Sequence, residues 1–209
     1  MVFVLISAGL SYAQQEVNNC YNYFQAGDYQ RAISSGENAV RLYPRNEFAH
    51  FCLGQSYYNA GELDKALKSM KEAERLAKAK DDLAAIYNKL GMIYDKKGDL
   101  DNALFYHNKE LSLNRELGDR RGEAIALNNI AVIYDKKGDP DKALDYYNQS
   151  LRLQDDEKEK APTYNNIAVI YSQKGDYNRA VEYLKKAIEI GQRAGDYHGV
   201  ARWMLNLGN

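Results

Sequence analysis

The sequence predicts an all-α protein, an α-solenoid in which helix–turn–helix units follow one another along the chain. Three observations predict it. A phrase of a glycine, an acidic residue and, five positions after the glycine, an alanine occurs at five places. A tyrosine stands four residues before each of these glycines. Only 3 of the 209 residues are proline, and a low proline content favours helices.

The turn phrase sets the period of the repeat. Its glycines are Gly27, Gly61, Gly98, Gly138 and Gly175, which gives spacings of 61−27 = 34, 98−61 = 37, 138−98 = 40 and 175−138 = 37 residues. Glycine readily adopts the left-handed conformation that ends a helix, and an Asp or Glu after it can cap the next helix. Pro140 suits the first position of a helix, where no partner for an N–H is needed. Each unit is therefore predicted to be two helices joined by a tight turn.

Further positions of the repeat are Leu53-Gly54, Leu90-Gly91, Tyr57, Ala66 and Pro44. Together these residues resemble the tetratricopeptide repeat (TPR). The periods of 37 to 40 residues resemble the longer-repeat branch, found in kinesin light chains and in bacterial sensor and regulator proteins. The resemblance implies a right-handed superhelix with a concave peptide-binding face. We expect the repeats at 14–46, 47–83, 84–123, 124–160 and 161–200, with a partial sixth at 201–209.

The first residues, MVFVLISAGLSYA, form an apolar run that ends in small residues at Ser11 and Ala13. This pattern matches a signal-peptidase site, although the positive start of a signal peptide is missing. Residues 1–13 are therefore predicted to be a signal-peptide remnant, which implies a periplasmic or extracytoplasmic location. The alternative is an apolar helix that packs on the first repeat of a cytoplasmic protein.

Two asparagine pairs interrupt predicted helices, although asparagine is a poor residue in a helix interior. In a stacked array, equivalent positions of successive first helices line the concave wall, and an amide there can hold a peptide backbone. The resemblance implies the same use. The predicted peptide-binding groove consists of Asn88, Lys89, Met92, Asn128, Asn129, Val132, Lys136, Asn165, Asn166, Val169 and Asn206. The alternative is that these amides bond to a neighbouring helix or to water.

Composition and the remaining motifs narrow the function. The chain has 28 basic and 29 acidic side chains, which argues against a protein that binds nucleic acid by neutralising phosphates. Cys20 and Cys52 are expected to be small buried hydrophobes, and a disulfide between them stays open. The run 155–160 is expected to be a solvated connection. No catalytic, metal or cofactor motif is found.

The predicted function is a non-catalytic scaffold that binds a protein or an extended peptide. Contact with a membrane is expected only through the export signal or a downstream segment. One alternative is an extracytoplasmic sensor or interaction fragment of a larger signalling protein. Another is self-assembly through the partial sixth repeat, where Trp203, Leu205 and Leu207 are expected to be partly exposed.

Overall fold

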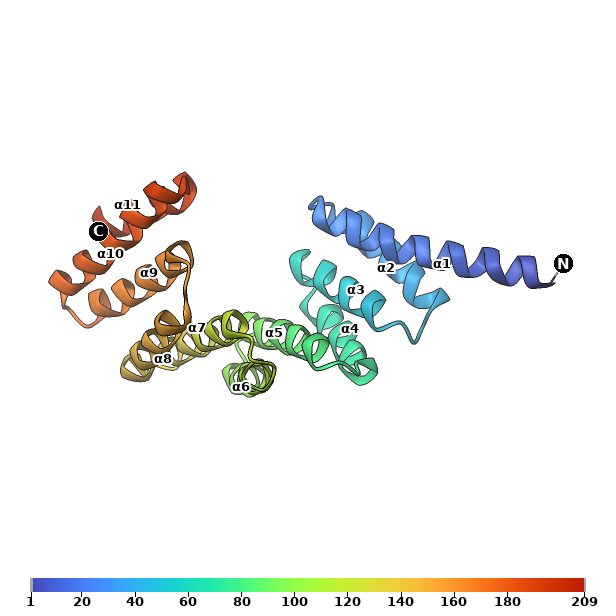
Figure 1. Cartoon of the computed structure of the whole chain (residues 1–209), viewed down its shortest axis with the longest axis horizontal. Coiled ribbons are helices and arrows are strands. Elements are labelled where there is room, and N and C mark those ends of the chain that lie inside the picture. Colours follow the sequence, from blue (N-terminus) through green and yellow to red (C-terminus); the bar gives the residue numbers. More distant parts are fainter. Residues whose placement is uncertain (1, 209) are drawn as a thin grey trace. The chain divides into compact units, whose positions relative to one another are not determined.

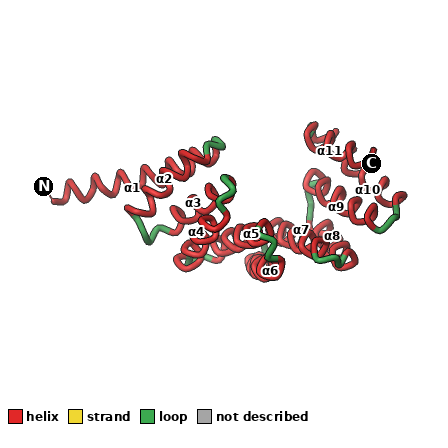
Figure 2. The backbone as a smooth tube through the Cα atoms, turned by 180° about the vertical axis from the view of Figure 1, so that it is seen from behind, coloured by secondary structure: helices red, strands yellow, loops and turns green. Residues whose placement is uncertain are grey.

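A computed structural model describes the backbone of residues 2–208 and the side chains of residues 12–205. The described backbone forms eleven α-helices joined by short loops, and it contains no strand (Figures 1 and 2). The helices are α1 (Val2–Gln25), α2 (Tyr29–Leu42), α3 (Glu47–Asn59), α4 (Leu63–Leu76), α5 (Lys80–Lys96), α6 (Leu100–Leu117), α7 (Arg120–Lys136), α8 (Pro140–Leu153), α9 (Glu157–Gln173), α10 (Tyr177–Ala194) and α11 (Tyr197–Gly208). The all-α array of helix pairs predicted from the sequence is confirmed.

The chain divides within α6 into two compact units, Met1–Tyr106 and His107–Asn209. In the first unit, α1 packs on α2 and α3, and α3 packs on α4 and α5. In the second unit, α7 packs on α8 and α9, and α9 packs on α10 and α11. The first helices of successive repeats are therefore in direct contact and form a wall within each unit.

The turn between the two helices of a repeat follows the predicted chemistry. Gly138 adopts a left-handed φ of 77°, and the other four turn glycines have φ values between 75° and 83°. The Asp139 N–H donates to the Tyr134 carbonyl at 2.9 Å, which closes α7. The Asp139 carboxylate accepts from the Lys142 N–H at 3.1 Å, which opens α8. These hydrogen bonds from the side chain and the backbone of Lys142 lower the pKa of Asp139.

Glu62 is the exception among the turn residues. Its side chain makes no capping hydrogen bond at the start of α4 and instead forms an ion pair with Lys65 at 2.6 Å. A glutamate carries its carboxylate one methylene farther from the backbone than an aspartate does. The prediction of a capping residue is therefore wrong for Glu62 and right for the aspartates of the other four turns.

The alanines of the turn phrase allow the two helices of each repeat to pack closely. Ala32, Ala66, Ala103, Ala143 and Ala180 are all at most 4% exposed. Each lies where a larger side chain would push the helices apart, and overpacking of a tight interior is destabilising. Their burial explains why the turn phrase has an alanine at this position.

At the N-terminus, α1 continues without a break past residue 13, and the Ala13 and Val17 side chains are both only 2% exposed. The side chains of residues 1–11 lie outside the described part of the chain, so the signal-peptide interpretation of 1–13 stays a prediction. No helix in the described part is long and apolar enough to cross a membrane.

At the C-terminus, the structure corrects one expectation for the partial sixth repeat. Trp203 is only 1% exposed because Val200, Leu184 and other apolar residues of α9 to α11 enclose its ring. Leu205 is 70% exposed, as expected. The side chains of Leu207 and Asn206 lie outside the described residues.

The charged run 155–160 is only partly a connection. Its last four residues, Glu157 to Lys160, form the first turn of α9, where Lys160 pairs with Glu157 at 2.5 Å. The expectation of a solvated linker is therefore wrong beyond Asp156. Acidic residues at the start of a helix interact favourably with its dipole, which explains why this run folds.

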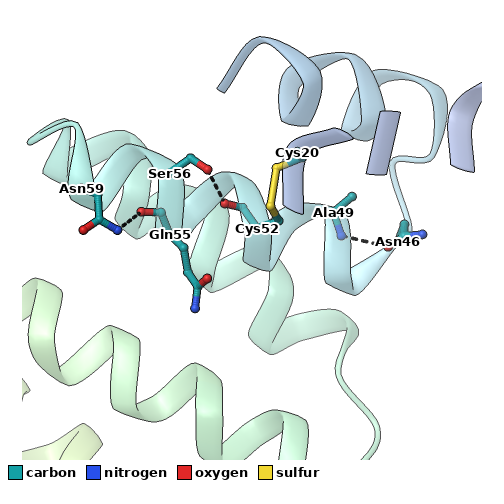
Figure 3. Close-up of a disulfide and its surroundings, with 7 residues drawn as sticks. All are labelled: Cys20, Asn46, Ala49, Cys52, Gln55, Ser56 and Asn59. Carbon is teal, nitrogen blue, oxygen red and sulfur yellow. Dashed lines mark hydrogen bonds between the residues drawn. A yellow bond between two sulfur atoms is a disulfide. The ribbon is translucent and has the colours of Figure 1, made fainter. Parts of the chain in front are cut away.

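Cys20 of α1 and Cys52 of α3 form a disulfide, with their Cα atoms 6.4 Å apart (Figure 3). Both residues are buried, as predicted, and their pairing settles the alternative that the sequence left open. Gly36 of α2 lets that helix lie against the bridge, because a Cβ at this glycine would come 3.1 Å from the Cys20 Sγ. The disulfide therefore ties the first two repeats together at a tightly packed point.

Reduction of this disulfide should destabilise the protein. Since the two cysteines are 32 residues apart, the loop-entropy model gives a loss of about 3–4 kcal/mol in the free energy of unfolding. Urea unfolding with and without a phosphine reductant measures this loss. A Cys20→Ala/Cys52→Ala variant is the control, because it should be unaffected by the reductant. Equal stability of the oxidised and reduced wild type would contradict the prediction.

Candidate functional site

A pocket of about 300 Å³ lies between the first helices α7 and α9 of the second unit. Helix α7 contributes one end of the lining, α9 the other, and the loop between α8 and α9 contributes a single glutamine. The lining residues are Arg121, Ala124, Ile125, Asn128, Asn129, Gln154, Glu159, Pro162 and Thr163. The pocket thus combines amide, hydroxyl, aliphatic and charged groups on the wall formed by the first helices.

An ion pair and an exposed aliphatic side chain form one side of the pocket. The Arg121 Nε lies 2.8 Å from the Glu159 Oε1 and joins the start of α7 to the start of α9. Ile125, one turn after Arg121, is 45% exposed. An isoleucine exposed to this degree beside polar groups provides apolar surface that a ligand side chain could cover.

The other side of the pocket contains a small hydrogen-bond network. The Asn128 Nδ2 donates to the Thr163 Oγ1 at 2.7 Å, and the Gln154 Nε2 donates to the same oxygen at 3.3 Å. The Gln154 Oε1 is buried without a hydrogen-bond partner. Among the described side chains, the only other buried polar atom in this state is the Trp203 Nε1. A buried acceptor without a partner is unfavourable, so an N–H group of a ligand would be stabilised there.

The position of Gln154 follows from how α8 ends. Helix α6 ends at Gly118, which has a left-handed φ of 69°, and α7 begins two residues later. Helix α8 has no glycine at its end, and Gln154 caps it with an extended backbone at ψ 105°. Because the chain leaves α8 in an extended conformation, the Gln154 side chain reaches the space between α7 and α9.

The structure separates the predicted asparagines into two groups. Asn128 and Asn129 both line the pocket. Asn165 and Asn166 are not part of its lining: the Asn165 Nδ2 donates to the Asn166 Oδ1 at 3.3 Å, and the Asn166 side chain hydrogen-bonds the Tyr147 hydroxyl. Burial is the main cause that raises the pKa of Tyr147, and the hydrogen bond from Asn166 acts in the opposite direction.

Within the described side chains, Asn129 makes no hydrogen bond, whereas the other three asparagines of these pairs do. The proposed alternative, in which the amides bond to a neighbouring helix, therefore describes Asn128 and Asn166. Of the four asparagines in these two pairs, Asn129 is therefore the one whose amide is available to a ligand. Its half-buried position keeps the amide accessible while the helix holds its direction.

The remaining predicted groove residues lie on the same first helices. Val132 and Val169 are half-buried on α7 and α9, and Lys136 is exposed at the end of α7. Asn88, Lys89 and Met92 are half-buried on α5 in the first unit. The structure places these side chains at the surface of their helices, and their use as a groove stays a prediction.

Sequence reasoning missed seven of the nine residues that line the pocket: Arg121, Ala124, Ile125, Gln154, Glu159, Pro162 and Thr163. Ile125 could have been found, because it lies three and four residues before Asn128 and Asn129 and so shares their helix face. The Arg121–Glu159 pair spans nearly one repeat and depends on how two repeats pack. Gln154 depends on the backbone direction at the end of α8. Neither the ion pair nor the position of Gln154 could be predicted from the spacing of residues in the sequence.

No group of three or more His, Cys, Asp or Glu in the described part of the chain could hold a metal ion. The groups that converge at the pocket are amides, a hydroxyl, an aliphatic side chain and one ion pair. Amides and hydroxyls can donate to and accept from a peptide backbone, and the aliphatic side chain can cover an apolar side chain.

Comparison with known families matches this fold. The family model for the tetratricopeptide repeat matches residues 47–116, 82–156 and 159–209. The chain belongs to the tetratricopeptide repeat family. The comparison with curated proteins found no match.

Solved structures of other TPR proteins share the fold. MamA is 24% identical, with a TM-score of 0.66, and the match covers 84% of this chain and 96% of MamA. BtubC (BKLC) from P. vanneervenii is 20% identical with a TM-score of 0.72, over 92% of this chain and 93% of BtubC. YrrB, described as a TPR protein with an unusual peptide-binding site, is 21% identical with a TM-score of 0.62, over 90% of this chain and 89% of YrrB.

The different hydrogen bonding of the asparagines predicts different effects on stability. Asn128→Ala and Asn166→Ala each remove a partly buried hydrogen bond and should lower the free energy of unfolding by about 1 kcal/mol. Asn129→Ala should change it by less than about 0.5 kcal/mol. Urea unfolding of the three single variants beside the wild type measures these differences. Equal losses in all three would show that Asn129 also has a structural partner.

Proposed function

We propose that this protein is a non-catalytic scaffold that binds an extended peptide segment of a partner protein along its first helices. The observation that carries the proposal is the α7–α9 pocket, where the available Asn129 amide, the exposed Ile125 and the unpartnered Gln154 Oε1 occur together. Membership of the TPR family supports a protein-interaction scaffold. The similarity to YrrB, a TPR protein with an unusual peptide-binding site, supports a peptide as the ligand.

The chemistry of the pocket suggests how the peptide is held. The Asn129 amide would donate to a backbone carbonyl and accept from a backbone N–H, without reading the ligand side chains. The Gln154 Oε1 would accept a second N–H, and Ile125 would pack against an apolar side chain. The predicted groove residues Val132 and Lys136 on α7 and Val169 on α9 would extend this contact along the peptide.

The test begins with a displayed library of random nonapeptides selected on the wild-type chain. Peptides that bind are then titrated against Asn129→Ala, Ile125→Asp and, as a matched control, Asn148→Ala, which removes an exposed amide of α8. We expect Asn129→Ala to weaken binding about tenfold, since losing one hydrogen bond of this kind is worth about 1–1.5 kcal/mol. Ile125→Asp should weaken it more, because it places a charge against an apolar group. Asn148→Ala should have no effect.

If Asn129→Ala and Ile125→Asp bind like the control, the α7–α9 pocket is not the site. Light scattering on the same samples tests the second candidate, self-association through α11, whose Met204 and Leu205 side chains are exposed. A mass that rises with protein concentration would favour self-association. A mass that stays at one chain would contradict it.

We also propose that the protein works outside the cytoplasm, in a compartment that permits disulfides. The apolar start of the chain with its Ser11–Ala13 pattern supports this proposal, and so does the buried Cys20–Cys52 bridge, because disulfides are rare in the reducing cytosol. Alkylation of free thiols in intact cells, followed by fractionation, tests it. We expect oxidised protein in the extracytoplasmic fraction. Reduced protein in the cytosolic fraction would overturn the proposal.

A further inference from the structure

The first unit contains a second pocket on its wall of first helices, with a different lining from the α7–α9 pocket. It lies between the starts of α3 and α5 and has a volume of about 410 Å³. Its apolar part consists of Phe48 and Phe51 of α3 with Ile86 and Ala85 of α5. Phe48 is 46% exposed, so an aromatic ring is presented to solvent.

A third aromatic ring extends this surface onto α1. The ring of Tyr21, itself 46% exposed, has its centroid 5.9 Å from that of Phe48. Phe51 stands ten residues before its turn glycine, as Asn128 does in the fourth repeat (61−51 = 138−128 = 10). The position that carries an amide in the fourth repeat therefore carries an aromatic ring in the second repeat.

The polar part of this pocket is acidic. Glu47 and Asp82 line it, and Asp81 is close enough to act on Glu47. Burial, followed by the Asp82 and Asp81 carboxylates, raises the pKa of Glu47. Among the described side chains, none of these three carboxylates takes part in an ion pair. The pocket thus combines aromatic rings with negative charges that repel one another.

We propose that the α3–α5 pocket binds a basic side chain, arginine before lysine, of a peptide ligand. This inference rests on the proposed function and adds to it the charge of the ligand. A cation would relieve the repulsion between the carboxylates, and ring faces attract cations. Arginine fits better than lysine because its planar guanidinium stacks on a ring and can bond two carboxylate oxygens.

The apolar residues of the α3–α5 pocket also favour a basic side chain. The aliphatic stem of an arginine or lysine can pack against Phe48 and Ile86 while its charged end reaches Glu47 and Asp82. A purely apolar ligand side chain would leave these carboxylates covered and without partners. An acidic side chain would add to the repulsion. The pocket therefore favours a basic residue over both.

The experiment uses the full-length chain and the same displayed nonapeptide library. Selection is run in parallel on the wild type and on Glu47→Gln/Asp82→Asn, which keeps the shape of the pocket and removes its two lining charges. The charge-matched control is Asp145→Asn/Glu189→Gln, which removes two exposed carboxylates from α8 and α10. Circular dichroism and urea unfolding check that all three proteins are folded. The pocket variant should be no less stable than the wild type, because the substitutions remove like-charge repulsion.

We expect the wild-type and control pools to be enriched in arginine and lysine at one position and the pocket-variant pool to lose this enrichment. Individual arginine peptides should bind Glu47→Gln/Asp82→Asn about tenfold more weakly, since a charge-assisted hydrogen bond is worth more than about 1.4 kcal/mol. Phe48→Ala should also weaken them, while their glutamine analogues should bind all variants alike. Weaker binding of the arginine peptides at higher salt would support the charge contribution.

The outcomes separate this inference from the proposed function. If peptides bind and depend on Asn129 but show no preference for basic residues, the proposed function stands and the acidic pocket is not a ligand site. If the preference is the same in the pocket variant as in the wild type, the basic residue is read elsewhere and the inference is wrong. If no peptide binds the wild type, both are overturned.

Discussion

The fold depends on one residue that serves two helices at once. In each turn phrase the residue after the left-handed glycine donates its N–H to the carbonyl of the tyrosine five positions before it, as Asp139 does to Tyr134 at 2.9 Å. At four of the five turns, the carboxylate of the same residue accepts a free N–H in the first turn of the next helix, from the residue three positions later. The end of one helix and the start of the next are therefore fixed by adjacent bonds, which sets the angle at which the two helices of a repeat pack.

The joints that lack this turn are where the candidate sites are found. Helices α6 and α10 end in left-handed glycines, Gly118 and Gly195, and the next helix follows directly. Helices α4 and α8 end instead in extended residues, Ala77 and Gln154. The α3–α5 pocket lies beside the first of these joints and the α7–α9 pocket beside the second. At the second of these joints, the Gln154 side chain of the connection reaches the space between the two first helices.

The sequence predicts what is local and repeated. The glycine turns, the buried alanines and Pro140 at the start of α8 depend only on neighbouring residues. Because the turn phrase occurs five times, one deviating copy does not hide the pattern. What could not be predicted depends on packing between repeats. The hydrogen bond from Asn166 to Tyr147 and the contact of Gln154 with Thr163 join different helices, and no spacing rule specifies them. The disulfide was only partly predictable, because the sequence shows both cysteines but not their pairing. Both cysteines depart from the repeat pattern. Cys20 replaces a glycine or alanine, and Cys52 stands where other repeats have Lys89 or Asn129.

Departures from the repeat pattern therefore carry the information that is specific to this protein. Two adjacent positions of the first helix, nine and ten residues before the turn glycine, make the point. In the fourth repeat they hold Asn129 and Asn128, and in the second repeat they hold Cys52 and Phe51. In both repeats these two positions lie on the first helix, α7 or α3. The helical backbone therefore fixes the direction of their side chains. In the second repeat, one of them closes the core through a disulfide and the other lines an acidic aromatic pocket. A common fold thus supplies the geometry, and the residues at these two positions decide whether a repeat presents two amides, or an aromatic ring beside a disulfide.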